Sequence, residues 1–316
     1  MIIQILILIA GLTLILAGAN YLVDGSSSIA KRFGISEFII GLTIVGIGTS
    51  TPEMVVSFMS AFQGKADMAV GNIVGSNIFN TLVNLGITAL ACPLAITKSN
   101  IRKDIPINIL VTILFIILGL NQTIFGYGED GLSRIDGTIL MLIFAWYFWS
   151  SFKDNSADEE SNTVVRTIPV SAIMIIGGLV GLIIGGRLFV NSATELAKML
   201  GVSDKFIAVT IMAAGTSMPE LATCVVAALK GRGQLALGNV LGSNIFNILL
   251  ILGGASLIHP LSLNGMTLID LGVLLICSLV IFLSAFLFKK KELDRIEAVL
   301  FLIIEGLYMW YLISNL

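Results

Sequence analysis

Gly48-Thr49-Ser50-Thr51-Pro52-Glu53 is the stretch that decides the fold, because it recurs in the second half of the chain as Gly215-Thr216-Ser217-Met218-Pro219-Glu220. A second stretch recurs at the same offset: GNIVGSNIFN at residues 71–80 matches GNVLGSNIFN at residues 238–247. When residues 34–80 are aligned with residues 201–247, 21 of the 47 positions are identical without a gap. The chain therefore contains an internal repeat.

The composition around these motifs is that of a membrane protein. Of the 316 residues, 56% are hydrophobic and 12% are charged, and the mean hydropathy is +1.00. So little charge cannot cover the surface of a soluble domain, and long apolar stretches recur along the whole chain. We predict an all-α, polytopic protein of the lipid bilayer. The only basic run is Lys289-Lys290-Lys291, which excludes a nucleic-acid-binding surface.

Hydropathy predicts ten transmembrane helices, five in each half of the chain. Two of them, the first and the sixth, are longer than the roughly 20 residues that a bilayer core requires, so they must tilt or project beyond it. The predicted spans are residues 2–32, 36–62, 67–91, 104–120, 134–152, 168–199, 205–229, 234–258, 267–288 and 295–314.

The basic residues predict the orientation of these spans. Of the 18 lysines and arginines, 13 fall in alternate connections on one side of the predicted membrane. Cytoplasmic connections carry an excess of Lys and Arg, so we predict that this side is cytoplasmic. Both termini are then on the extracytoplasmic side of the cell membrane.

An odd number of spans in each half predicts an inverted-topology repeat, since the second half enters the membrane from the opposite side. We divide the chain into an N-terminal five-helix repeat (1–152), a cytoplasmic linker (153–166) and a C-terminal five-helix repeat (167–316). Repeats of this kind place a binding site at their interface, near the membrane midplane and on interrupted helices.

Glu53 and Glu220 lie centrally in the second and seventh spans, where a charge costs several kcal/mol. Each follows a proline, which removes a backbone donor and disfavours helix at the preceding residue. We expect both helices to break there and to turn free carbonyls towards a cavity. Thr49 and Ser50 precede Glu53 by four and three residues, so these side chains are expected to share one helix face.

The third and eighth spans add further oxygen-bearing side chains. They carry Ser76 with Asn80, and Ser243 with Asn247. Every candidate ligand is an oxygen, which suits a hard cation such as Ca²⁺, whereas softer ligands would indicate zinc or copper. The two carboxylates together neutralise one Ca²⁺, and protons are expected to compete for them. The cations would be transported substrates, and no cofactor is predicted.

With these motifs the chain resembles the cation/calcium exchanger superfamily, and it is most similar to the prokaryotic sodium/calcium exchangers. The resemblance covers essentially the whole length, including both copies of Gly-Thr-Ser-x-Pro-Glu and of Gly-Asn-x-x-Gly-Ser-Asn-Ile-Phe-Asn. It implies antiport of Na⁺ against Ca²⁺ by alternating access. In that family the first and sixth spans slide across a rigid core of eight helices.

The resemblance also implies roles for individual residues. Glu53 and Glu220 would hold Ca²⁺ and share Na⁺, with backbone carbonyls of Thr49 and Thr216 added to the Ca²⁺ shell. The four serines would bind Na⁺ in flanking sites, carbonyls would complete the outer shells, and two amides would line the centre. These are Ser50, Ser76, Ser217 and Ser243; Gly46 and Ala213; and Asn80 and Asn247.

One position departs from the family pattern, because several relatives have Asp where Asn247 stands. Two carboxylates then remain, which argues against potassium dependence and puts a stoichiometry of three Na⁺ per Ca²⁺ in doubt. Glu305 in the tenth span has no counterpart in the first half, where Phe144 occupies the matching position.

Three other classes of function compete with Na⁺/Ca²⁺ antiport. A Ca²⁺/H⁺ exchanger, or another cation exchanger of the superfamily, stays open because both glutamates can be protonated. An intramembrane enzyme would need one asymmetric acid–base pair, which the doubled set of oxygens disfavours. A channel would not need inverted repeats around a single site. No obligate protein partner is indicated.

Overall fold

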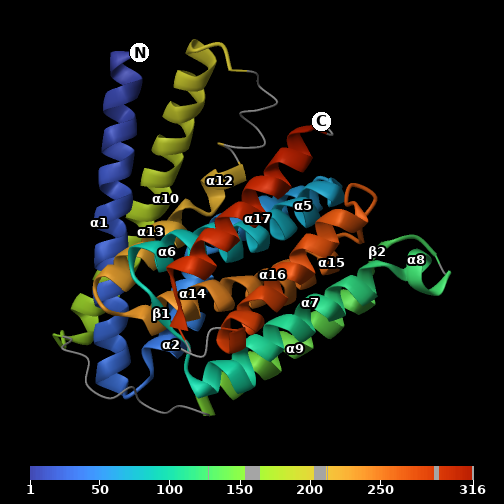
Figure 1. Cartoon of the computed structure of the whole chain (residues 1–316), viewed down its shortest axis with the longest axis horizontal. Coiled ribbons are helices and arrows are strands. Elements are labelled where there is room, and N and C mark those ends of the chain that lie inside the picture. The colour runs from blue at the N-terminus through green and yellow to red at the C-terminus, as the bar shows by residue number, and fades with distance from the viewer. Residues whose placement is uncertain (127, 154–163, 203–210, 212, 288–291, 315–316) are drawn as a thin grey trace.

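The computed structural model describes residues 1–126, 128–153, 164–202, 211, 213–287 and 292–314. Within these residues the chain is helical almost throughout, with four strands of two residues each, which confirms the all-α prediction (Figure 1). Four of the helical segments are π-helical turns, labelled η.

The first half runs from α1 to α9. Its elements are α1 (Ile2–Phe33), α2 (Glu37–Ile40), η1 (Gly41–Val45), α3 (Gly46–Thr49), α4 (Thr51–Phe62), α5 (Ala66–Phe79), η2 (Asn80–Asn84), α6 (Leu85–Ala91), β1 (Leu94–Ala95), η3 (Asn100–Asp104), α7 (Ile105–Gly119), α8 (Asn121–Phe125), β2 (Gly131–Leu132) and α9 (Arg134–Lys153).

The second half follows the same order. Its elements are α10 (Ile168–Met199), α12 (Ala213–Thr216), α13 (Met218–Leu229), α14 (Gly233–Phe246), η5 (Asn247–Leu252), α15 (Gly253–Ile258), β3 (Leu261–Ser262), α16 (Leu268–Leu287), β4 (Glu292–Leu293) and α17 (Arg295–Ser314).

Seven helices of the described chain are long and apolar enough to cross a membrane, and the bent pair Glu37–Thr49 and Thr51–Phe62 makes an eighth. Two of the ten predicted spans do not meet this test. The span predicted at 104–120 contains α7, which has 15 residues. The span predicted at 205–229 lies partly outside the described residues and contains the 12-residue α13. The chain is a multi-pass membrane protein.

The predicted breaks before Glu53 and Glu220 are present. Ser50 (φ −79°, ψ 8°) separates α3 from α4, and Ser217 (φ −90°, ψ 5°) separates α12 from α13. The first break bends the helix axis by 48°. In both halves proline lies in the first turn of the new helix, where its missing N–H costs nothing.

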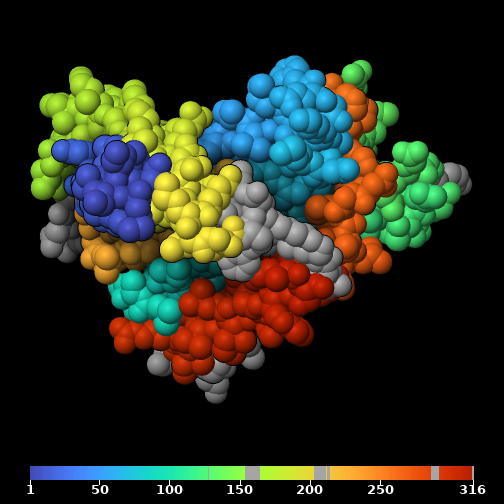
Figure 2. All heavy atoms as spheres, turned by 90° about the horizontal axis from the view of Figure 1, so that it is seen from above, coloured from blue at the N-terminus to red at the C-terminus, as the bar shows by residue number. Residues whose placement is uncertain are grey.

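The two 32-residue helices, α1 and α10, lie side by side at one edge of the molecule (Figures 1 and 2). Glycines bring their backbones together: a Cβ at Gly18 would lie 2.7 Å from the carbonyl oxygen of Gly178, and one at Gly11 would lie 2.9 Å from that of Gly185. The pairs are reciprocal, since Gly178 and Gly185 are the repeats of Gly11 and Gly18. Small residues permit this close approach of helices in lipid.

The short strands pair across the two halves in the same reciprocal way. Leu94 of β1 is opposite Leu293 of β4, and Leu132 of β2 is opposite Leu261 of β3. In the order of elements, β3 of the second half corresponds to β1, and β4 corresponds to β2. Each antiparallel pair therefore joins a loop of one half to the loop of the other half that is not its own repeat.

Candidate cation-binding site

Glu53 and Glu220 lie in the first turns of α4 and α13, immediately after the two helix breaks. Their side chains are 1% and 0% exposed. The amino-terminal end of a helix favours negative charge, because its first N–H groups have no partner within the helix. Proline and the break therefore place each carboxylate where a helix end stabilises its charge.

The serines beside the breaks bond to the glutamate of the opposite half. Ser50 Oγ donates to Glu220 Oε1 over 3.1 Å, and Ser217 Oγ donates to Glu53 Oε1 over 3.4 Å. Ser50 thus bonds to the glutamate of the opposite half, across a 48° bend from α4, and the shared helix face of Ser50 and Glu53 stays a prediction. Within its own half, Glu53 Oε1 accepts a bond from Ser76 Oγ at 3.4 Å.

The remaining predicted ligands of the first break are buried in contact with α14. The Thr49 hydroxyl donates to the carbonyl of Val45 at 3.0 Å and to Asn239 Oδ1 at 3.1 Å. Ser243 Oγ donates to the carbonyl of Gly46 at 3.4 Å. In the second half Ala213 and Thr216 form the two ends of α12, and Thr216 is half-buried. The twelve predicted residues thus belong to the segments at the two breaks, to α5 and α14 beside them, and to the first residues of η2 and η5.

An amide network joins the two halves and contains two residues that the sequence prediction missed, Asn77 and Asn244. Asn247 Nδ2 donates to Asn77 Oδ1 at 2.9 Å, and Asn80 Nδ2 donates to Asn244 Oδ1 at 3.3 Å. These bonds are reciprocal, because Asn244 and Asn247 are the repeats of Asn77 and Asn80. Identity in both copies of the motif is the signal that could have identified them.

Asn80 and Asn247 also begin the π-helical turns η2 and η5. A π-turn inserts an extra residue into the helix and is frequent at functional sites. Both turns start at the predicted ligand, and both shift the residues that follow around the helix. No residue type marks a π-turn, so η2 and η5 cannot be predicted from the sequence.

Three buried oxygen atoms at this site have no hydrogen-bond partner in the described structure: Glu53 Oε2, Glu220 Oε2 and Asn247 Oδ1. Burying a carboxylate oxygen without a partner is costly. A hard cation would supply the missing partner, and carboxylate and amide oxygens are the ligands that Ca²⁺ takes. Asn80 differs, because its Oδ1 accepts a bond from Asn84 Nδ2 at 2.7 Å.

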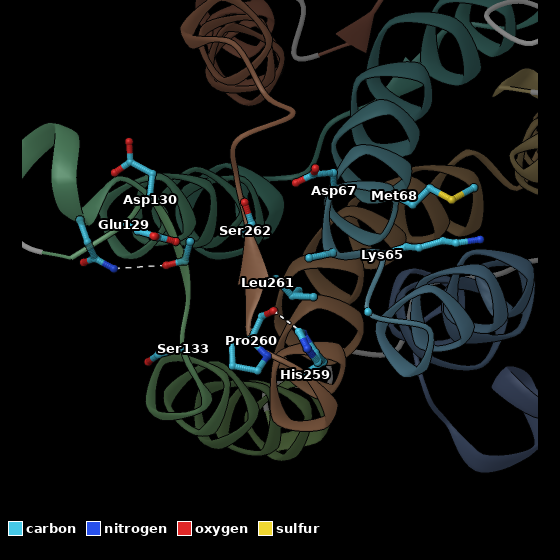
Figure 3. Close-up of a pocket in the computed structure, with 14 residues that line it drawn as sticks. Lys65, Asp67, Met68, Glu129, Asp130, Ser133, His259, Pro260, Leu261 and Ser262 are labelled. Atoms are coloured by element: carbon cyan, nitrogen blue, oxygen red, sulfur yellow. Dashed lines mark hydrogen bonds between the residues drawn. The ribbon is translucent and has the colours of Figure 1, made fainter.

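A cavity of about 700 Å³ lies away from the twelve predicted ligands. It lies at the loops between α4 and α5, before β2 and before β3, and none of the twelve predicted ligands lines it. Figure 3 shows that its charged side chains Lys65 and Asp130 point away from one another, while His259 bonds to the carbonyl of Pro260. Two hydrogen bonds from Thr123 lower the pKa of Asp130. Among the residues that the structure describes, no group of three or more His, Cys, Asp or Glu side chains at this cavity could hold a metal ion.

Comparison with known proteins assigns the class. The model of the sodium/calcium exchanger protein family matches residues 3–153 and 170–314. The sodium/calcium exchanger MaX1 of Methanosarcina acetivorans is 32% identical over 94% of this chain and 95% of its own length. The uncharacterized membrane protein MJ0091 of Methanocaldococcus jannaschii is 37% identical over 92% of each chain.

A solved structure agrees with these relatives. The sodium-calcium exchanger NCX_Mj, in a crystal soaked with zero Na⁺ and Ca²⁺, superposes with a TM-score of 0.84 at 32% identity over 98% of this chain and 99% of its own. The chain belongs to the sodium/calcium exchanger family, which confirms the resemblance seen in its repeated motifs. It is a cation antiporter, and its relatives are transporters and not enzymes.

Proposed function

We propose that the protein exchanges Na⁺ for Ca²⁺ across the cell membrane by alternating access. The observation that carries this proposal is the pair of fully buried carboxylates, Glu53 and Glu220, each with one oxygen left without a partner. Their combined charge of −2 matches one Ca²⁺. Serine hydroxyls around them supply the neutral oxygens that suit Na⁺.

The reciprocal contacts support an inverted-topology repeat with halves at 1–152 and 167–316. Contacts between the halves come in matched pairs: Ser50 bonds to Glu220, and Ser217, the repeat of Ser50, bonds to Glu53, the counterpart of Glu220. The amide–amide, glycine–glycine and strand–strand contacts follow the same rule. A two-fold axis between the halves produces this pattern. An axis in the plane of the membrane gives the two halves opposite topology.

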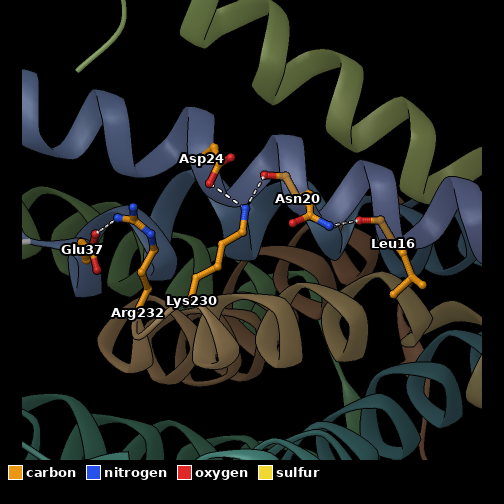
Figure 4. Close-up of polar contacts among 6 residues, drawn as sticks. All are labelled: Leu16, Asn20, Asp24, Glu37, Lys230 and Arg232. Carbon is orange, nitrogen blue, oxygen red and sulfur yellow. Dashed lines mark hydrogen bonds and ion pairs between the residues drawn. The ribbon is translucent and has the colours of Figure 1, made fainter. Parts of the chain in front are cut away.

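One ion pair near the predicted cytoplasmic side joins α1 to the turn after α13, and it is weak enough to permit the sliding proposed for α1. Lys230, in the turn after α13, reaches Asp24 of α1 over 2.7 Å and the carbonyl of Asn20 over 3.4 Å (Figure 4). Arg232 in the same turn pairs with Glu37 of α2. Lys230 and Asp24 are partly exposed, and partly exposed pairs of this kind contribute little stability. They can therefore exchange as α1 moves.

The charge at the site bears on stoichiometry. Two carboxylates balance one Ca²⁺ or two Na⁺, and a third Na⁺ leaves one net charge on the moving carrier. We propose three Na⁺ per Ca²⁺, with the third held by hydroxyl and carbonyl dipoles. Moving one charge across the membrane is worth about 2.3 kcal/mol per 100 mV. A voltage-dependent reversal of flux in proteoliposomes clamped with K⁺ and valinomycin is expected, and a reversal that ignores voltage would mean two Na⁺.

The experiment that tests the function measures ⁴⁵Ca²⁺ uptake into proteoliposomes under imposed Na⁺, K⁺ or H⁺ gradients. An outward Na⁺ gradient alone should drive uptake, and collapse of the pH gradient should leave it unchanged. Uptake that follows an H⁺ gradient in the absence of Na⁺ would instead identify a Ca²⁺/H⁺ exchanger. Flux that persists without any counter-ion would identify a channel.

A further inference from the structure

A cavity of about 350 Å³ adjoins the cation site on one flank. Its described wall includes Ser76 and Thr216 of the predicted ligand set and Asn72 beside them. The opposite wall comes from α16 and α17 and from Gly265 and Met266 in the loop before α16. That loop is on the predicted extracytoplasmic side. The cavity therefore connects the neighbourhood of the site with one face of the membrane.

Glu305 of α17 lines this cavity and has unused ligand capacity. Its Oε2 atom is buried and has no hydrogen-bond partner in the described structure, a property it shares with Glu53 and Glu220. An ionisable residue in the middle of a membrane helix is costly unless it faces a partner or a polar cavity. Glu305 faces the cavity.

The other carboxylate on this wall, Asp270, is already occupied. Its Oδ1 accepts a bond from the Tyr308 hydroxyl at 2.8 Å. Its Oδ2 accepts bonds from the backbone and the hydroxyl of Thr267, both at 2.8 Å. Asp270 thus closes the first turn of α16 and fastens α17 to it. Of the two acids, Glu305 is the one whose oxygen is available to a cation.

The matching place in the first half is filled by aromatic rings. Phe144 stands where Glu305 stands in the second half, and its ring lies edge-on to Phe246 at 5.3 Å and beside Phe148 at 5.8 Å. Phe246 is 1% exposed. The repeat therefore provides a carboxylate on one flank of the site and an apolar plug on the other.

We propose that Glu305 is the charged ligand of a second, weaker cation site in this cavity, which holds Ca²⁺ briefly between the extracytoplasmic solution and Glu53 and Glu220. The proposal rests on the exchange function proposed above. A negative charge in a cleft with low-dielectric walls raises the local cation concentration and the rate of entry. Because the first half has phenylalanine here, the effect belongs to one face of the membrane alone.

The transport test compares Glu305→Gln with wild type in right-side-out and inside-out membrane vesicles, with ⁴⁵Ca²⁺ uptake measured against external Ca²⁺. The half-saturating Ca²⁺ concentration should rise about three- to tenfold in right-side-out vesicles, which expose the cavity, with unchanged maximal rate. Inside-out vesicles should show less than a twofold change. Equal changes in both orientations, or none, would overturn the proposal.

Two variants control this experiment. Glu129→Gln makes the same chemical change at an exposed residue of the same side that does not line this cavity, and it should behave as wild type. Glu305→Asp keeps the charge and should restore most of the wild-type half-saturation. Failure of the aspartate variant to do so would show that Glu305 acts through packing and not as a ligand.

A binding measurement separates this proposal from the exchange function. Calorimetric titration of the detergent-solubilised protein with Ca²⁺ should show a tight and a weak phase in wild type, and Glu305→Gln should lose the weak phase alone. Wild-type vesicles without Na⁺-driven uptake would overturn the exchange function, whereas this titration would still test Glu305. A weak phase that survives in Glu305→Gln would overturn the site.

Discussion

The helices α5 and α14 carry nearly the same sequence on opposite flanks of the proposed cation site, yet the contacts of their glycines with the described residues differ. A Cβ at Gly242 of α14 would lie 2.3 Å from the carbonyl oxygen of Leu42, and one at Gly238 would lie 2.2 Å from that of Phe38. On α5, the described structure has nothing within 4 Å of a Cβ at Gly75. The residues that correspond to Phe38 and Leu42 lie outside the described part of the chain.

Burial follows the same division. In the apolar 18-residue stretch of the span Gly233–Ile258, 94% of the residues are buried, whereas in that of Ala66–Ala91 72% are buried. The ligands themselves are buried on both flanks, with Ser76 at 4% and Ser243 at 0% exposure. Within the described residues, the glycines of one copy of the motif contact α2 and η1, whereas those of the other copy line a cavity. The alternating access proposed above would require an inequality of this kind between the two flanks.

The largest expected effect is the same in both halves in spite of this difference. Glu53→Gln and Glu220→Gln should each abolish ⁴⁵Ca²⁺ uptake in proteoliposomes, because either change leaves one charge against a dehydrated divalent ion. Binding is expected to fall with transport in a Ca²⁺ titration. Uptake near the wild-type rate in either variant would contradict the assignment of the site.

Alanine substitutions at the matched glycines Gly242 and Gly75 test directly whether the two flanks are packed differently. Gly242→Ala should destabilise the protein by about 1–3 kcal/mol, because the added methyl group meets a backbone carbonyl that cannot move alone. At Gly75 no described residue lies within 4 Å of an added methyl group, so Gly75→Ala should change stability less than Gly242→Ala. The measurement is the Tm of each variant in detergent. Equal losses at both glycines would mean that the two flanks are packed alike.

The α1–α10 contact offers a second matched pair of glycines. Gly18→Ala puts a methyl group 2.7 Å from the Gly178 carbonyl oxygen, whereas Gly177→Ala meets nothing within 4 Å in the described structure. Gly18→Ala should lower the Tm and slow turnover by separating the two helices, and Gly177→Ala should do neither. Normal turnover in Gly18→Ala would show that the pair need not move as a unit.

The smallest expected effect sharpens the difference between the two central amides. Asn247→Asp adds a third carboxylate beside Glu53 and Glu220, and three close carboxylates cannot all ionise. Inhibition of uptake by acid should therefore begin about one pH unit higher than in wild type. Asn80→Asp should shift the profile less, because Asn80 Oδ1 is already bonded to Asn84. Identical shifts for both variants would contradict this distinction.

Several features could be predicted from the sequence because their causes are local. Proline at residues 52 and 219 disfavours helix at the residue before it, and a break lies at Ser50 and at Ser217. A repeat at a fixed offset shows which residues correspond, and the family comparison agrees with that pattern. The number of membrane spans agrees less well with the prediction, since α7 and α13 are shorter than a membrane-crossing helix of ordinary length.

Other features depend on contacts between residues that are far apart in the chain. Ser50 bonds to Glu220 in the opposite half of the chain, a partner that spacing along the sequence does not indicate. Asn77 meets Asn247 because α5 and α14 cross at the interface of the halves. The π-turns at Asn80 and Asn247 have no signature in residue type.

The sequence by itself determined the class of protein and the two repeats, because the motifs recur at a fixed offset. It also determined the pair of carboxylates, because a charge inside a membrane span is costly and indicates a functional site. The tertiary structure alone decided which hydroxyl reaches which carboxylate, which oxygens remain without a partner and which flank of the site has a cavity. Those facts follow from how two nearly identical halves pack against each other. Packing is set by distances between residues of opposite halves, which no local pattern of residues encodes.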